Sequence, residues 1–185
     1  MGKDRKNVGI RILCCCALRD CHSRRLFDNG NYEHASVAYR RAGQNRKAKI
    51  CDAYLLQEKA ELISTTASAT RKRAFVAAAN AFSTCAQNSL LKQERLTCYE
   101  AAGDCYFKAC DQKSAGESYV LAELYPEAAC AYQEGGLFEE MVRVITRHKH
   151  VFDDGLHEQL MMVARRHYFK VPSNCFFQTS LTTSA

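Results

Sequence analysis

The sequence has 185 residues, of which 47% are hydrophobic and 25% charged, the balance of an ordinary soluble protein. No apolar run approaches the roughly 18 residues that a membrane-spanning helix needs, so no membrane span is expected. Only 2 residues are proline and 9 are glycine, and runs of β-branched residues are almost absent. These features predict an all-α fold.

The net charge of +6 is distributed unevenly along the chain. Residues 1–50 hold 12 Lys or Arg against 4 Asp or Glu, a local charge of +8, whereas the remaining residues carry −2. A basic surface therefore belongs to the N-terminal quarter. It is either a solvated helix face with an unstructured arm, or a contact for nucleic acid or acidic lipid.

The 11 cysteines are numerous and odd in number. The apolar residues 12–18 are too few for a convincing signal peptide, so the cysteines are expected to be reduced thiols in the cytoplasm or nucleus. The adjacent Cys14, Cys15 and Cys16 leave palmitate attachment as an alternative.

In chain order, residues 1–20 are predicted to be a basic, cysteine-rich arm. Residues 21–170 form a helical repeat domain, and residues 171–185 an uncharged, disordered tail. The first helix ends at Leu26-Phe27, and a turn follows with Asn31 as the cap of the next. The second helix runs from Tyr32 to Ala42-Gly43. Residues 64–70 are a polar connection, and residues 70–73 lead into a fourth helix that ends near Ala86. The remaining predicted helices span residues 45–62, 91–109, 113–124, 126–134, 138–148 and 153–169.

A spaced triplet recurs five times in phase with these predicted helices. It has a small residue, an aromatic residue four positions later, and a second small residue three positions after that. The five triplets are Ala35-Tyr39-Ala42, Ala78-Phe82-Cys85, Ala102-Tyr106-Ala109, Ala115-Tyr119-Ala122 and Ala128-Tyr132-Gly135. Five such triplets in phase indicate a helical repeat.

The stretch from Leu96 to Glu127 has the spacing of a tetratricopeptide repeat (TPR), W-x2-L-G-x2-Y followed by A-x3-F. The matching residues are Tyr99, Ala102, Gly103, Tyr106, Ala115, Tyr119 and Ala122, and Pro126 falls about one residue early for the closing proline. Two helices cross closely only where small residues receive aromatic rings, and Ala115 is expected at the tightest crossing. This pattern predicts a TPR-like α-solenoid of antiparallel helix hairpins.

Motifs that would carry catalysis or bind a cofactor do not occur in the sequence. The only Gly-Lys pair is Gly2-Lys3, so there is no P-loop, and H-E-x-x-H and G-x-S-x-G are absent. His148 and His150 form H-x-H, but no C-x2-C pair accompanies them. We therefore expect no enzymatic activity, no cofactor and no structural metal.

Eight basic residues are candidate contacts for nucleic acid, provided that the second, third and fourth helices expose them on one side. They are Arg40, Arg41, Arg46, Lys47, Lys49, Arg71, Lys72 and Arg73. Contacts of this kind would reach phosphates, weaken with salt and read little sequence.

Four segments together resemble one family. They are Leu26-Phe27-Asp28, Tyr32-Glu33-x-Ala35-x3-Tyr39-x2-Ala42-Gly43, Ala53-Tyr54-Leu55-Leu56-x-Glu58-x-Ala60, and Tyr125-x2-Ala128-Ala129-x2-Tyr132-x2-Gly135-Gly136-Leu137-Phe138. They resemble the TPR-like helical arm of large fungal UvrD-like helicases, relatives of the TPR and ankyrin repeat-containing helicase-like protein. The resemblance covers residues 24–170 and implies part of a larger helicase-like protein. Its helicase core is missing here, so no ATP or DNA chemistry carries over to these residues.

Two functional hypotheses follow. The first is a protein-interaction scaffold whose partner is a protein or peptide, including a helicase module, held on the inner surface of the array. The second is a basic nucleic-acid-binding appendage that acts through the N-terminal quarter.

Overall fold

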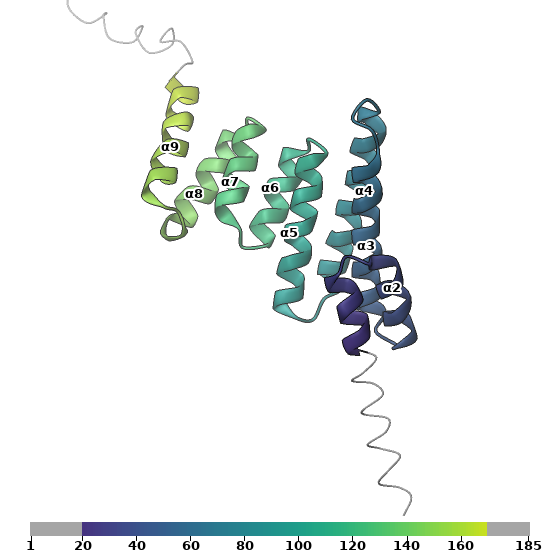
Figure 1. Ribbon diagram of the computed structural model, residues 1–185. Helices are drawn as coiled ribbons and strands as arrows, with labels where there is room; N and C mark the ends of the chain where they lie inside the picture. Colours follow the sequence, from purple (N-terminus) through teal and green to yellow (C-terminus); the bar gives the residue numbers. More distant parts are fainter. Residues whose placement is uncertain (1–19, 170–185) are drawn as a thin grey trace, which may run out of the picture.

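The computed structural model describes residues 20–169 and is helical through most of that range (Figure 1). Helical residues 20–28 precede α2 (Tyr32–Arg41), α3 (Asn45–Leu62), α4 (Ser68–Gln87), α5 (Lys92–Lys108), α6 (Gln112–Leu121), α7 (Tyr125–Glu134), α8 (Phe138–Arg147), the 3-10 helix η1 (Lys149–Val151) and α9 (Asp154–Phe169). No strand occurs between residues 20 and 169, which confirms the all-α prediction. The predicted arm, apart from Asp20, and the predicted tail lie outside the described residues.

Each helix packs mainly on the helices before and after it in the chain. Contacts join α2 to α3, α3 to α4, and so on through α8 and α9, with a smaller contact between α7 and α9. Figure 1 shows the result, a row of helices side by side in chain order from α2 to α9. The predicted helical stacking is therefore confirmed.

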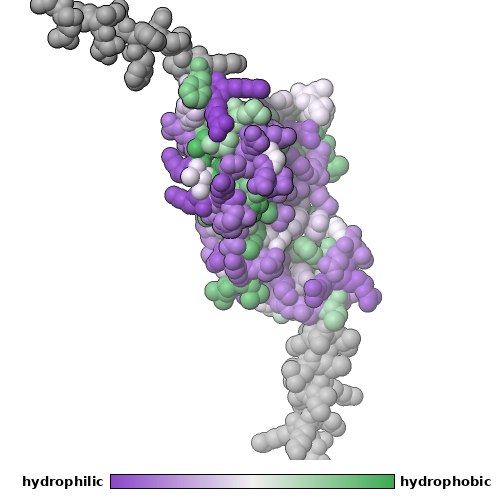
Figure 2. Space-filling model, turned by 90° about the vertical axis from the view of Figure 1, so that its left-hand side faces the viewer, coloured by the Kyte–Doolittle hydropathy of each residue, from purple (hydrophilic) through white to green (hydrophobic). Residues whose placement is uncertain are grey.

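Small side chains and aromatic rings fill the core between neighbouring helices. The buried residues form three clusters along the chain, around Tyr39, around Phe82, and within residues 115–164. Tyr106 packs against both the second and the third cluster. Because each cluster involves neighbouring helices, the core extends along the stack rather than around one centre. On the face shown in Figure 2, the surface is mainly hydrophilic, with hydrophobic residues in smaller patches.

Five turns between helices share one backbone geometry. Their central residues have φ angles of 60 to 74° and are Gly30, Gly43, Cys110, Glu123 and Gly136. The next residue donates its backbone N–H to the carbonyl five residues earlier, as Gln44 does to Tyr39 at 2.9 Å. This is the Schellman motif, which satisfies the last carbonyls of a helix. In four turns the accepting carbonyl belongs to the aromatic residue of a sequence triplet, namely Tyr39, Tyr106, Tyr119 and Tyr132.

The observed helix boundaries match the predicted ones closely but not everywhere. Helix α3 spans residues 45–62 as predicted, whereas α4 begins at Ser68, so residues 68–70 are helical rather than part of the connection. Helix α6 ends at Leu121 instead of residue 124, because Glu123 adopts the left-handed turn conformation with φ of 62°. Asn31 is the N-cap residue of α2, but its side chain makes no capping bond and lies 2.7 Å from His34 Nδ1.

Two glycines mark the closest approach of neighbouring helices. A Cβ atom added to Gly103 would lie 2.7 Å from Cε1 of Tyr119, and one added to Gly116 would lie 2.4 Å from Cε1 of Tyr132. Gly103 therefore receives an aromatic ring, as its place in the TPR-like spacing suggested. Ala115 is fully buried, but the tighter approach is at the adjacent Gly116.

Candidate functional site

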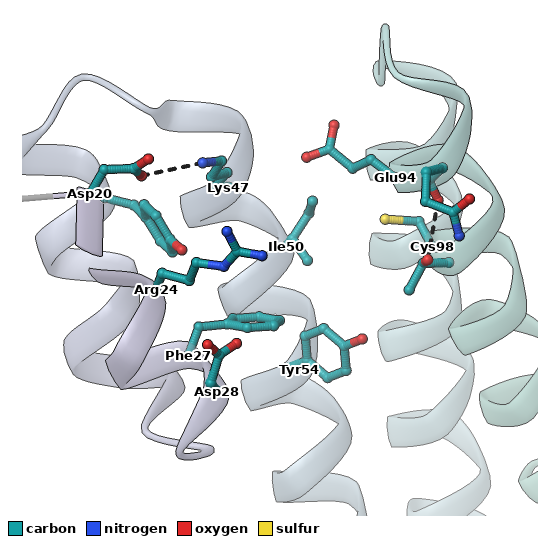
Figure 3. A pocket seen from close by; sticks show the side chains of 12 residues that line it. Asp20, Arg24, Phe27, Asp28, Lys47, Ile50, Tyr54, Glu94 and Cys98 are labelled. Atoms are coloured by element: carbon teal, nitrogen blue, oxygen red, sulfur yellow. Dashed lines mark hydrogen bonds and ion pairs between the residues drawn. The ribbon is translucent and has the colours of Figure 1, made fainter. Parts of the chain in front are cut away.

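A hollow of about 430 Å³ opens between residues 20–28, α3 and α5, which are every second helical segment in this part of the chain (Figure 3). We call it the groove. Residues 20–28, α3 and α5 supply most of its lining, so these segments share one side of the stack. The lining residues are Asp20, Arg24, Phe27, Asp28, Tyr39, Lys47, Ile50, Tyr54, Gln93, Glu94, Thr97 and Cys98.

Phe27 and Tyr54 give the groove an aromatic wall. Their ring centroids lie 5.4 Å apart in an edge-on arrangement, and Tyr32 stacks on Tyr54 at 4.8 Å. Tyr54 also meets Phe82, with 4.8 Å between ring centroids, so the wall is continuous with the buried core. Burial raises the pKa of Tyr54 to about 12, so its hydroxyl stays protonated at neutral pH. The wall is therefore mainly apolar and carries no charge at neutral pH.

Charged side chains of both signs surround this wall. The carboxylate of Asp20 accepts a hydrogen bond from Lys47 Nζ at 3.3 Å. Hydrogen bonding to Gln44, and then to Lys47, holds the pKa of Asp20 below its usual range. Figure 3 shows Arg24 reaching across the groove toward α3 and Glu94 on the facing side, on α5. A ligand in the groove would meet an apolar surface bordered by both cations and anions.

The cysteines in and near the groove are buried rather than reactive. Cys98, which lines it, is 3% exposed, and burial raises the pKa of its thiol to about 12. Burial likewise raises the pKa of Cys51 to about 11 and that of Cys105 to about 12. Because the thiolate is the nucleophile and the metal ligand, thiols that stay protonated at neutral pH are suited to packing. Cys98 therefore serves as an apolar packing residue in the groove.

The eight candidate nucleic-acid contacts fall into two groups. Arg40 and Arg41 end α2 and Arg46, Lys47 and Lys49 begin α3, whereas Arg71, Lys72 and Arg73 lie in the first turns of α4. Arg46 and Lys49 border a hollow with Thr84, Cys85 and Asn88, at the far end of α4. At 1.5 Å per residue, that end lies roughly 20 Å from Lys72 along α4. The structure therefore does not bring all eight residues into one stripe.

Several of these cations already have partners within the described residues. Arg40 pairs with Asp52 at 2.5 Å, and Lys47 pairs with Asp20. Asp52 also accepts a hydrogen bond from Ser36 Oγ at 2.6 Å, which ties α2 to α3. The guanidinium of Arg71 lies 5.5 Å from the ring centroid of Phe75. These four contacts serve the packing between helices or within α4.

The residues of the predicted repeat signature lie mainly in the core. The buried members are Ala35, Tyr39, Ala78, Phe82, Ala102, Gly103, Ala109, Ala115, Tyr119, Ala122, Ala128 and Tyr132. Ala42, Cys85, Tyr99 and Tyr106 are partly buried, and Gly135 is exposed. Two of the tyrosines also reach a neighbouring helix through the hydroxyl, Tyr106 to Asn80 at 2.6 Å and Tyr119 to Asp104 at 2.7 Å.

No motif in the sequence predicted the groove as a site. Lys47, Ile50 and Tyr54 follow one another at spacings of three and four residues, which places them on one face of α3. That spacing is a signal that could have been read from the sequence. Gly116 carries a similar signal, because a glycine inside a predicted helix often marks a close approach.

Two other kinds of site are absent from the described part of the chain. Between residues 20 and 169, no three His, Cys, Asp or Glu side chains are grouped so that they could hold a metal ion. Over the same residues, no helix has the length and apolar character needed to cross a membrane.

Comparisons with protein-family models, with curated proteins and with solved structures each find no match to this chain. The function therefore has to be inferred from the chain itself.

Proposed function

We propose that residues 20–169 form a TPR-like α-solenoid of antiparallel helix hairpins and that it serves as a protein-interaction scaffold. Three features support the repeat: the five spaced triplets, the five Schellman turns and the packing of each helix on its chain neighbours. The observation that supports this function most directly is the groove, which residues 20–28, α3 and α5 line together. Such a surface is suited to a helix or extended segment of a partner.

The groove suggests how a partner segment binds. An apolar side chain packs against Phe27 and Tyr54, and polar groups on either side of it meet Arg24 and Glu94. Contacts are spread over residues 20–28, α3 and α5, so affinity is shared by several helices rather than concentrated in one pocket.

The resemblance to the helical arm of fungal UvrD-like helicases supports a more specific proposal about the partner. In that setting the array binds a helicase module, or another part of a parent protein, through the groove. The expectation of reduced thiols supports a location in the cytoplasm or nucleus.

A substitution that fills the groove tests this proposal. Thr97 lines the groove on α5 and is exposed, so Thr97→Arg adds bulk there without disturbing the core. With the full chain as bait, we expect Thr97→Arg to lower the recovery of bound protein at least about tenfold, the size of a typical hot-spot loss. The measurement is quantitative mass spectrometry of the retained material.

The matched control is Thr146→Arg on α8. Both threonines are exposed and donate their hydroxyl to the carbonyl four residues earlier, at 3.1 Å for Thr97 and 2.8 Å for Thr146. Thr146→Arg should retain the same proteins as the unmodified chain. Equal retention by the two variants would show that the groove is not the binding surface.

The alternative function is nucleic-acid binding through the N-terminal quarter. If it holds, replacing Arg40, Arg41, Arg46, Lys47 and Lys49 together with Gln weakens RNA and DNA binding and flattens its dependence on salt, because fewer counterions are released. Filter binding over a salt series measures both effects. Losing the exposed Arg40 and Lys47 ion pairs should cost little stability. Unchanged binding by this variant would exclude the alternative.

A further inference from the structure

Two adjacent leucines are left in solvent at one turn of the stack. Leu90 is 84% exposed and Leu91 is 63% exposed, and both lie between α4 and α5. Single exposed apolar residues are common on proteins, but two large neighbouring ones at the tip of a turn form a projecting apolar point. This point is separate from the aromatic wall of the groove.

Cations line the same hollow as Leu91. Leu91 borders a hollow of about 390 Å³ together with Arg46 and Lys47, from the start of α3. Arg46 and Lys49 border the next hollow, with Asn88 from the end of α4. The turns before α3 and before α5 are therefore neighbours at the same end of the helices.

Most of this charge is available to a ligand. Arg41 ends α2, two residues before Gly43, which borders the hollow beside Leu91. Within residues 20–169, Arg41, Arg46 and Lys49 form no ion pair, and all three are exposed. Glu94 is the acidic residue that borders both hollows, and its carboxylate accepts a hydrogen bond from Ser89 Oγ. We call the surface formed by Arg41, Arg46, Lys49, Leu90 and Leu91 the basic edge.

We propose that the basic edge binds the surface of a membrane rich in anionic phospholipid, with Leu90 and Leu91 entering the boundary between headgroups and acyl chains. Anionic headgroups attract cations near the surface, and exposed apolar side chains gain free energy by leaving water there. The two contributions reinforce each other because the leucines and the cations lie at the same end of the helices. The bound ligand is the phospholipid phosphate or carboxylate together with the upper part of its acyl chains.

The leucines favour a lipid surface over nucleic acid. Phosphates of RNA or DNA would engage Arg41, Arg46 and Lys49 but would leave Leu90 and Leu91 in water, because a phosphate backbone has no apolar layer to receive them. A bilayer accepts both kinds of side chain at once. Nucleic-acid binding at this edge is therefore the competing outcome of the test.

The absence of tryptophan from the chain allows a direct test of insertion. Leu90→Trp places the only tryptophan of the chain at the basic edge, in place of a side chain that is 84% exposed, so folding should be unaffected. With vesicles of phosphatidylcholine and phosphatidylserine, its emission should shift to shorter wavelength and be quenched by brominated acyl chains. Vesicles of phosphatidylcholine alone should give neither effect.

The matched control is Leu62→Trp. Leu62 is 86% exposed but ends α3, so it lies at the opposite end of that helix, roughly 25 Å from Arg46 at 1.5 Å per residue. This variant should show no shift with either kind of vesicle. Equal shifts at the two positions, or no shift at Leu90→Trp, would overturn the proposal.

A second measurement tests the cations in the full chain. Arg41→Gln, Arg46→Gln and Lys49→Gln together should lower partitioning onto phosphatidylserine vesicles by about tenfold or more, since each cation near an anionic surface contributes about fivefold. The changes Lys72→Gln and Arg73→Gln, at the start of α4, are the control and should have less effect. All variants keep the five basic residues of positions 1–19, so only the edge differs.

A short single-stranded RNA separates the two classes of ligand. The lipid proposal holds if the Leu90→Trp emission shifts with phosphatidylserine vesicles and RNA does not abolish that shift at matched ionic strength. It is overturned if the triple Gln variant loses RNA binding but keeps vesicle binding.

Discussion

Replacing Phe82 with Ala should lower the free energy of unfolding by about 3–5 kcal/mol, the range for removing a fully buried phenylalanine. Phe82 on α4 has no exposed surface, and its ring meets Tyr54 edge-on with 4.8 Å between centroids. The substitution leaves a cavity in the middle cluster of the core and removes the support beneath the aromatic wall of the groove. Tm should fall by roughly 10 °C for a chain of this size.

Urea or thermal unfolding followed by circular dichroism measures this loss, with Phe82→Leu as the control. Leucine keeps most of the apolar contact, so its effect should be clearly smaller than that of alanine. If both variants unfold at the same point as the unmodified chain, Phe82 does not lie in the core that we describe.

Gly116→Ala should destabilise the protein by about 1–3 kcal/mol, the usual range for overpacking a core. An added Cβ would lie 2.4 Å from Cε1 of Tyr132, and that ring is only 5% exposed. Because the ring is enclosed, α6 and α7 must separate to accommodate the methyl group. The gain of about 1 kcal/mol that alanine normally gives inside a helix offsets only part of this loss.

Gly155→Ala is the control, since Gly155 is also a helical residue, in the first turn of α9. There an added Cβ would meet only the side chain of Asp153, an exposed residue, at 3.1 Å. This variant should be as stable as the unmodified chain or slightly more stable, and differential scanning calorimetry compares the two. A Gly116→Ala protein with an unchanged Tm would contradict the close crossing of α6 and α7.

Helices with clear local signals were predictable from the sequence. The bounds of α3 came out as expected because Gly43 precedes it and a polar segment follows it. The end of α6 was not predictable in the same way, since Glu123 takes a left-handed conformation that usually signals glycine or asparagine. Glu123 has the same Schellman geometry as Gly43. The turn geometry therefore overrides the preference of a glutamate for negative φ.

The groove and the basic edge were harder to predict because each depends on segments that are distant in the sequence. The groove needs residues 20–28, the first half of α3 and the start of α5, which only the packing of the helices brings together. The basic edge needs Leu90 and Leu91 beside the cations of α3. In the sequence those leucines resemble the beginning of an apolar helix face, so their exposure becomes visible only in the fold.

The measurement that most directly tests the central claim is capture of protein partners by the full chain after nuclease treatment, with washes at low and at moderate salt. We expect a defined set of proteins to be retained at both salt concentrations, because apolar burial in the groove depends little on ionic strength. The same set should be lost with Thr97→Arg. Loss of all bound protein on nuclease treatment or at moderate salt would contradict the scaffold proposal.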